Sequence, residues 1–184
     1  GEGDSDFNYG GAKLHNMFWL QLQAPRPGNK PTGEIKTLIE SKHKTFDAFK
    51  KELIRSAMTI QGSGWVYVAK NGNIKITPNQ SYKTDILMPV DMWEHSFSDY
   101  VPAKDAKKKY IEGMMRIINW ESINLRLRNA IDELAYANEY RHIIINDSFD
   151  DAKNELFGII AQEKSFNRQN TEEVQKFLAQ LLSY

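Results

Sequence analysis

The segment Asp91-Met-Trp-Glu-His95 has the residue types and spacing that most favour metal chemistry in this sequence. A carboxylate and an imidazole four residues apart can face one point in space, and their oxygen and nitrogen atoms suit manganese or iron. The same pair is also typical of a simple hydrogen bond or a cap, so the pattern alone leaves both interpretations open. The chain has no cysteine, which excludes disulfides and thiolate ligands, and its histidines are His15, His43, His95 and His142.

Other kinds of active site are not indicated by the sequence. No segment has the glycine-rich pattern of a phosphate-binding loop. Ser63 lies between two glycines, but a nucleophile elbow joins a strand to a helix, whereas this segment leads into a predicted strand. No apolar run reaches the roughly 18 residues that a membrane span needs, so a soluble protein without membrane contact is expected.

Five segments, in the same order along the chain, together resemble the iron/manganese superoxide dismutases. Asp91–His95 resembles the Asp-x-Trp-Glu-His motif of this family. The other segments are Gly10-Gly11 with His15 and Phe18-Trp19, then Gly62-Ser63-Gly64-Trp65, Asn79-Gln80 and Ile118-Asn119-Trp120. The resemblance covers about residues 10–127, and the combination is far more specific than any one of its parts.

The resemblance implies a metal site with His15, Asp91 and His95 at three of the family's four ligand positions. The family's remaining ligand histidine lies in an N-terminal helical hairpin, and this chain starts too late to contain it. We therefore expect a remnant or incomplete site, without metal or, if the site is retained, with manganese or iron. The alternative for the two histidines is a pair of neutral, hydrogen-bonded core side chains.

The resemblance extends to residues around those ligands. It implies that Gln80 hydrogen-bonds to metal-bound solvent and that Trp65 and Trp93 form an aromatic wall that keeps the site dry. Gly11 in combination with Gln80 is similar to the manganese-type arrangement. These positions predict a second layer of contacts that orients the ligands.

A two-fold interface is also implied, at Glu94 and Ser63. Glu94 matches the family residue that reaches across the interface to a ligand histidine of the partner. We therefore expect a homodimer or a heterodimer with a related chain. The alternative for Glu94 is a local salt bridge or solvent exposure.

Departures from the family pattern decide which function the resemblance implies. Ser96-Phe97-Ser98 stands where the family usually has Ala-Tyr-Tyr, and Lys107–Tyr110 stands where it has Arg-Pro-x-Tyr. The sequence is most similar to the superoxide-dismutase-like proteins of the fungal mitochondrial ribosomal small subunit. This implies a structural component of that subunit, in the mitochondrial matrix, without dismutase activity. The alternative is a manganese superoxide dismutase, converting superoxide to oxygen and hydrogen peroxide, seen as an N-terminally truncated chain.

The elements that must position these residues are predicted from hydrophobic periodicity. Helices are predicted over about residues 13–23, 34–41, 45–60 and 105–120. Strands are predicted over residues 65–69, 74–77 and 86–90. Asn71-Gly72 predicts a two-residue type I′ hairpin between the first two strands. The order predicts an α+β fold, with a three-stranded antiparallel sheet packed with helices.

The chain is predicted to have three parts. Residues 1–9 form a flexible N-terminal segment, residues 10–127 the superoxide-dismutase-like domain, and residues 128–184 a helical C-terminal extension. The last helix of that extension is predicted after Thr171, where apolar residues recur at helical spacing.

The formal net charge is zero, which argues against broad polyanion binding, but the charge is unevenly distributed. Residues 101–128 carry seven basic and three acidic side chains, whereas residues 129–184 carry five basic and ten acidic ones. The local excess predicts limited contact with phosphates or an acidic partner. The family resemblance implies that these partners are ribosomal proteins and, to a limited extent, ribosomal RNA. Its alternative is an ordinary solvated helix face. The basic residues are Lys104, Lys107, Lys108, Lys109, Arg116, Arg126 and Arg128.

Overall fold

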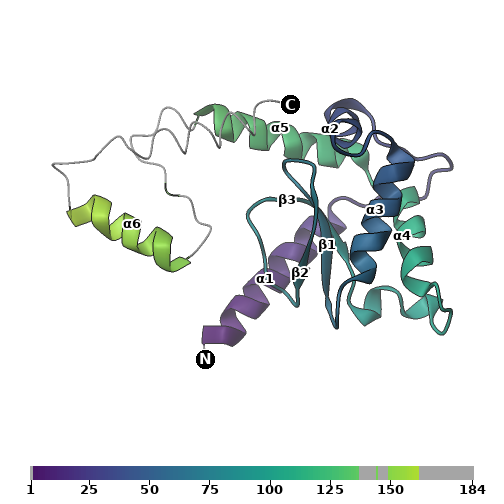
Figure 1. The fold of residues 1–184 in the computed structure, drawn as a ribbon, viewed down its shortest axis with the longest axis horizontal. Helices are drawn as coiled ribbons and strands as arrows, with labels where there is room; N and C mark the ends of the chain where they lie inside the picture. Colours follow the sequence, from purple (N-terminus) through teal and green to yellow (C-terminus); the bar gives the residue numbers. More distant parts are fainter. Residues whose placement is uncertain (1, 137–143, 145–148, 162–184) are drawn as a thin grey trace. The chain divides into compact units, whose positions relative to one another are not determined.

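The computed structural model describes residues 2–136, 144 and 149–161 (Figure 1). The chain forms two compact units, Gly1–Arg128 and Asn129–Tyr184. The helices are α1 (Glu2–Trp19), α2 (Gly33–His43), α3 (Phe46–Met58), α4 (Ala106–Ile117), α5 (Trp120–Tyr136) and α6 (Phe149–Ala161). The strands are β1 (Gly64–Ala69), β2 (Ile74–Pro78) and β3 (Ile86–Asp91). Short 3₁₀ turns follow β3, η1 (Glu94–Ser96) and η2 (Ser98–Tyr100).

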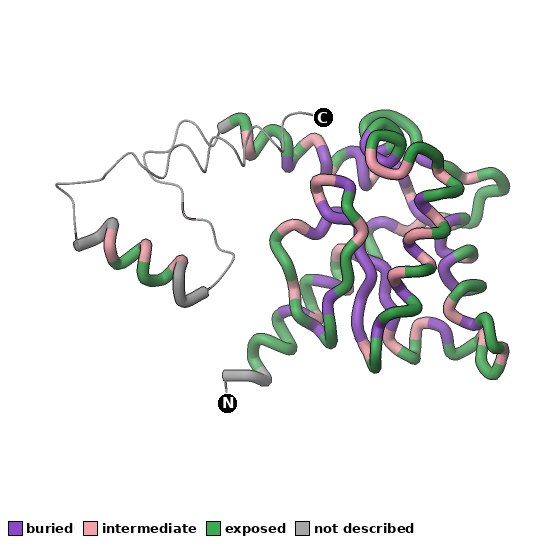
Figure 2. The backbone as a smooth tube through the Cα atoms, viewed as in Figure 1, coloured by how far each residue is buried: buried purple, intermediate pink, exposed green. Residues whose placement is uncertain are grey.

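The predicted α+β class and the three-stranded antiparallel sheet are confirmed. The strand order is β2-β1-β3, and Trp65 of β1 lies opposite Thr77 on one side and Asp91 on the other. Every residue of β1 and β3 is buried, which Figure 2 shows as purple backbone through the middle of the first unit. The β1–β2 connection is a hairpin as predicted, but of another turn type. A type I′ turn needs positive φ at both central residues, and here only Gly72 has it.

Helices cover the sheet and build the core of the first unit. In Figure 1 the sheet lies between α1 and the pair α3 and α4, with α1 packed on β3 and α3 packed on β1 and β2. Thr45 is the N-cap of α3, because its side chain accepts a hydrogen bond from the Ala48 N–H at 3.1 Å. Phe49 of α3 and Trp65 of β1 are fully buried, so the large aromatic side chains lie at the centre of this core.

The first helix begins earlier than predicted. It was expected over residues 13–23, but α1 begins at Glu2 and ends at Trp19. The flexibility expected of residues 1–9 stays a prediction. Gly10 and Gly11 serve close packing, which the sequence did not indicate. A Cβ atom on Gly10 would lie 1.9 Å from the carbonyl oxygen of Gln80. The two glycines therefore let α1 approach the loop after β2 closely.

The helical region after the sheet is divided at Ile118. The helix expected over residues 105–120 ends at Ile117, where Ile118 adopts an extended conformation and forms a β-bridge with Leu22. The following helix, α5, is continuous across the boundary predicted between residues 127 and 128. The helix predicted after Thr171 lies outside the described residues. Among the described residues, no helix is long and apolar enough to cross a bilayer.

Two buried tyrosines predict a loss of stability at alkaline pH. Burial raises the pKa of Tyr110, and burial together with the charge of Asp85 raises the pKa of Tyr67. The unfolded chain loses these phenol protons near pH ~10, whereas the folded chain keeps them to higher pH. The free energy of unfolding should therefore fall as the pH rises above about 10. The free energy of unfolding, measured by urea titration at several pH values above about 10, should fall less steeply with pH for Tyr110→Phe than for the wild-type chain. Equal dependence on pH in the two proteins would contradict the prediction.

Candidate metal centre

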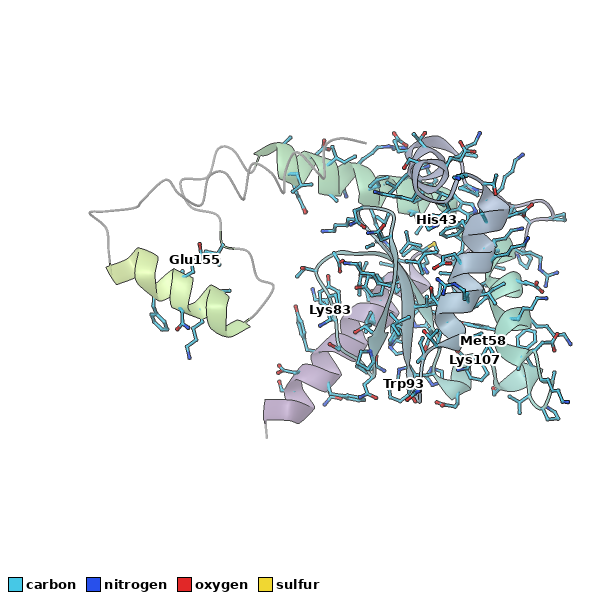
Figure 3. The ribbon with its side chains drawn as sticks, viewed as in Figure 1. His43, Met58, Lys83, Trp93, Lys107 and Glu155 are labelled. Carbon is cyan, nitrogen blue, oxygen red and sulfur yellow. The ribbon has the colours of Figure 1, made fainter. Side chains whose placement is uncertain are left out.

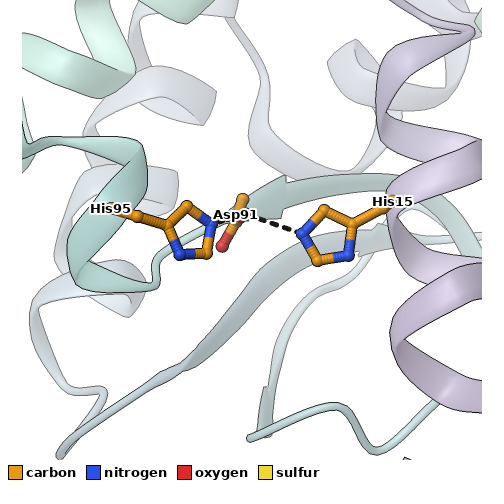
Figure 4. A group of neighbouring side chains, drawn as sticks. All are labelled: His15, Asp91 and His95. Carbon is orange, nitrogen blue, oxygen red and sulfur yellow. Dashed lines mark hydrogen bonds and ion pairs between the residues drawn. The ribbon is translucent and has the colours of Figure 1, made fainter. Parts of the chain in front are cut away.

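The structure brings His15, Asp91 and His95 together at one point. Their nearest ligand atoms all lie within 4.8 Å of one another. Nε2 of His95 is 2.9 Å and Nε2 of His15 is 3.4 Å from Oδ2 of Asp91. Figure 4 shows the two imidazoles approaching the carboxylate from opposite sides, one from α1 and the other from the turn after β3. Two imidazole nitrogens and one carboxylate oxygen suit manganese or iron.

Asp91 is the most buried of the three because it ends a buried strand. Its side chain is only 3% exposed, and its Oδ1 atom accepts a hydrogen bond from the Trp93 N–H at 2.9 Å. This bond leaves Oδ2 to face both histidines. The Ser96 hydroxyl donates a hydrogen bond to the Asp91 carbonyl oxygen at 2.9 Å, which ties the last residue of η1 to the end of β3. The β3–η1 turn thus positions Asp91 and His95 together.

The hydrogen bonding of His15 suits a metal ligand. Its Nδ1 atom lies 2.8 Å from the Gly11 carbonyl oxygen, one turn earlier in α1, and so carries the proton. A neutral His15 therefore presents an unprotonated Nε2 to the Asp91 carboxylate. Two lone-pair atoms face each other at 3.4 Å, an arrangement that a cation coordinated by both would favour. The tautomer of His15 and the facing lone pairs are therefore compatible with a metal ion held by these residues.

Trp65 and Trp93 contact the two histidines, and Gln80 is bonded to Trp65. The ring of Trp65 meets the His15 ring edge-on at 4.9 Å, and Trp93 stacks on His95 at 6.2 Å. Trp65 Nε1 donates a hydrogen bond to the Gln80 Oε1 atom at 3.1 Å. The amide oxygen of Gln80 is therefore in use, and its NH₂ group is the donor that remains. Trp65 and Gln80 are buried, whereas Trp93 is only partly buried.

Access to the cluster is unequal on its two sides. The His95 side chain is 59% exposed, whereas that of His15 is 29% exposed. Phe7, in the first turns of α1, lies 6.1 Å from the Trp93 ring and covers part of this region. Small molecules can therefore reach the three ligands from the His95 side.

Glu94 and Ser63, the residues predicted for a two-fold interface, lie side by side on the surface. The Ser63 hydroxyl donates to Glu94 Oε2 at 2.8 Å, and Glu94 directly precedes His95 in the chain. A hydrogen bond from its own backbone N–H, followed by that from Ser63, lowers the pKa of Glu94. Glu94 is exposed and charged, so the pair presents an anionic group next to His95.

Two of the seven basic residues are engaged inside the chain. The Arg126 guanidinium donates to Gln21 Oε1 at 2.9 Å, to the Leu87 carbonyl at 3.2 Å and to the Met17 carbonyl. Arg126 is thus held within the first unit by these three bonds, and its contact with RNA or a partner stays a prediction. Arg128 forms ion pairs with Glu34 at 2.9 Å and with Glu121 at 3.0 Å.

The remaining basic residues lie on or before α4. Lys109 pairs with Asp105 at 3.2 Å and Lys108 with Glu112 at 3.9 Å, both as exposed neighbours. Lys107 lies over the Phe97 ring at 5.7 Å from its centre. The other two members of the set, Lys104 and Arg116, are exposed. Exposed ion pairs of this kind are weak. These five side chains, the four lysines and Arg116, therefore remain available to an acidic surface.

His43, the other histidine among the described residues, does not join the cluster. Figure 3 shows His43 at the opposite end of the first unit from Trp93, where its Nε2 atom lies 3.0 Å from the Gly72 carbonyl oxygen. His142 lies outside the described residues. The sequence interpretation missed Gln21, which is fully buried and donates to the Pro89 carbonyl at 2.6 Å. The sequence did contain a signal for Gln21: it is a polar residue three positions after Phe18, on the apolar side of the helix predicted over residues 13–23.

Comparison with known proteins identifies relatives of this architecture. Residues 31–126, which include Asp91 and His95, match the family described as iron/manganese superoxide dismutases, C-terminal domain. A manganese superoxide dismutase of Listeria ivanovii is 38% identical over 128 residues, covering 65% of this chain and 61% of that protein. A mitochondrial manganese superoxide dismutase of Drosophila melanogaster is 34% identical over 134 residues, covering 67% of this chain and 60% of that protein.

The chain spans about three fifths of the length of these relatives. The family match covers more than half of the chain. The chain belongs to the iron/manganese superoxide dismutase family.

Proposed function

We propose that this chain holds manganese or iron at His15, Asp91 and His95, and that superoxide dismutation is the activity this site serves. The observation that carries the proposal is the convergence of the three ligand atoms within 4.8 Å. A bound manganese or iron ion would supply one-electron redox chemistry. In the overall reaction one superoxide is oxidised to dioxygen, while a second takes up that electron and two protons to form hydrogen peroxide.

The residues of this chain would hold and orient the ligands. Gly11 sets the tautomer of His15 through its carbonyl oxygen, and the Trp93 N–H sets the rotation of the Asp91 carboxylate. Trp65 excludes water from the buried side of His15. The NH₂ group of Gln80 is a donor able to hydrogen-bond to solvent at the site.

Metal analysis with an activity assay tests this proposal. The purified chain, expressed with manganese and separately with iron, should contain about one ion per chain by plasma mass spectrometry. Superoxide consumption should be measured on the same preparations. Absence of stoichiometric metal would contradict the metal site, whereas bound metal without turnover would contradict only the enzymatic part.

We propose a structural role in the small subunit of the mitochondrial ribosome, in the matrix, as the second candidate function. The exposed lysines of α4 support it, since they can meet ribosomal proteins and a limited stretch of RNA. Ser98 and Lys107–Lys109 support it as well, because they replace family residues near the site. The internal contacts of Arg126 and Arg128 reduce the basic surface and weigh against extensive RNA contact.

Sedimentation tests the ribosomal candidate. The chain should migrate with small mitochondrial ribosomal subunits on gradients at moderate salt, and replacing Lys104, Lys108 and Lys109 together by Gln should weaken that association. Migration of the wild-type chain only as a free protein would remove this candidate. Because metal content is measured separately, either candidate can fail without the other.

Glu94→Ala is expected to weaken a two-fold association of the chain. We propose that Glu94 and Ser63 lie at such an interface, with a second copy or a related chain, since Glu94 is exposed, precedes His95 and accepts a hydrogen bond from the partly buried Ser63. The dissociation constant from analytical ultracentrifugation should rise about tenfold or more, as for loss of a charged hydrogen bond. Glu52→Ala, in an exposed pair with Arg55, is the control and should leave association unchanged. Equal association of both variants and wild type would contradict the interface.

A further inference from the structure

Strand β3 lies at the edge of the sheet, and two side chains donate hydrogen bonds to carbonyls on its free edge. The strand order β2-β1-β3 leaves one side of β3 without a neighbouring strand, so alternate backbone carbonyls on that side need donors. Gln21 Nε2 donates to the Pro89 carbonyl at 2.6 Å, and Arg126 Nη1 donates to the Leu87 carbonyl at 3.2 Å. Leu87 and Pro89 are two residues apart, which is the spacing of groups on one edge of a strand.

The same two side chains are joined to each other and to α1. Arg126 Nη1 donates to Gln21 Oε1 at 2.9 Å, and Arg126 Nη2 donates to the Met17 carbonyl in the last turn of α1. The C-terminal end of a helix carries partial negative charge, so a guanidinium is favoured there. Arg126 itself lies on α5, so the network connects three elements that are distant in sequence.

The network lies close to two metal ligands. Met17 follows His15 by two residues on α1, and Pro89 precedes Asp91 by two residues on β3. Among the ligand contacts, the His15–Asp91 separation of 3.4 Å is the one that spans α1 and β3, whereas Asp91 and His95 lie on one short turn. Relative movement of α1 and β3 would therefore change the His15–Asp91 separation first.

We propose that Arg126 and Gln21 form a positioning clamp that sets the separation of His15 from Asp91 and so tunes the affinity and geometry of the metal site. The clamp rests on the metal binding proposed above. Neither residue touches the site, so both act through the placement of α1 on β3. Residues outside the ligand set that hold ligands in place typically change metal affinity about 10–100-fold.

The test compares clamp variants with a variant of similar stability. Arg126→Gln and Gln21→Met should weaken manganese affinity about 10–100-fold in chelator competition and alter the electron paramagnetic resonance spectrum of bound manganese. Arg126→Lys, which keeps a cationic donor, should recover part of the affinity. Phe49→Leu, in a buried ring cluster with Phe46 and His43, is the control for stability alone. It should leave the affinity and the spectrum unchanged at a matched loss of stability.

Two outcomes would overturn the clamp. Equal affinity loss in Phe49→Leu and in the clamp variants would show only a general stability effect, and unchanged affinity in Arg126→Gln would remove its role.

If the wild-type chain binds no manganese, the proposed function fails, and nuclear magnetic resonance of the imidazole nitrogens then tests the clamp without metal. The His15 Nε2 resonance should move in Arg126→Gln and stay in Phe49→Leu. An unmoved resonance in Arg126→Gln would contradict the clamp.

Discussion

Asp91→Asn is expected to abolish stoichiometric metal binding while leaving the chain folded. Asn has the same shape, and its amide oxygen can keep the hydrogen bond from the Trp93 N–H. Its NH₂ group would then face Nε2 of His15 and of His95 in place of the carboxylate oxygen. A donor in that place can bind the His15 lone pair but cannot bind a cation. Metal affinity should fall by more than the roughly 100-fold that outer residues cause.

The matched control for Asp91→Asn is Asp85→Asn. Asp85 is another aspartate at a strand of the same sheet, paired with Lys75 at 2.7 Å and more than a third exposed. Its loss should cost about 0–1 kcal/mol of unfolding free energy and leave the metal content unchanged. Metal should be measured by plasma mass spectrometry and folding by circular dichroism. A wild-type metal content in Asp91→Asn would show that the three-residue cluster is not the binding site.

Gly10→Ala is expected to lower the free energy of unfolding by about 3 kcal/mol, at the upper end of overpacking effects. The added Cβ would lie 1.9 Å from the Gln80 carbonyl oxygen and 3.1 Å from its carbon. Both are backbone atoms, so no side-chain rotation relieves the clash. Alanine favours a helix over glycine by at most about 1 kcal/mol, which is too little to compensate. Displacement of α1 would also carry His15 away from Asp91, so metal affinity should fall as well.

Gly11→Ala provides the comparison within the same helix. Its Cβ would meet the side chain of Gln80 at 3.3 Å, and a side chain can move by a few tenths of an ångström. The loss should therefore be clearly smaller than for Gly10→Ala in urea unfolding. Gly158→Ala in α6, where a Cβ meets nothing within 4 Å, should be neutral or stabilising. Equal stability of the Gly10 and Gly11 variants would contradict the close approach.

The strands and the Asp91–His95 pair could be recognised in the sequence because their signals are local. Val66 and Val90 lie in short apolar runs, and Asn71-Gly72 between two such runs indicates a hairpin. Asp91 and His95 stand four residues apart at the end of a strand. His15 was placed with them by family resemblance, since nothing local connects residue 15 with residue 91.

The features that were not predicted depend on contacts between distant segments. Gly10 was recognised only as part of a family motif, and its close contact with the Gln80 backbone was not predicted. Arg126 was read as an exposed cation, since charge counts along a sequence do not show which guanidinium lies against the carbonyls of another element. Gln21 was overlooked for the same reason, because its partner Pro89 is 68 positions away.

The ligand set has a consequence for how the chain could be held together. It has no cysteine, so no disulfide can cross-link it. His15 lies on α1, Asp91 ends β3 and His95 follows it. An ion bound to all three would therefore act as a reversible cross-link that closes the loop of chain between residues 15 and 91. At a free metal concentration a thousandfold above the dissociation constant, such a link would add about 4 kcal/mol to the free energy of unfolding. The lifetime of the folded chain would then follow the metal supply of its compartment.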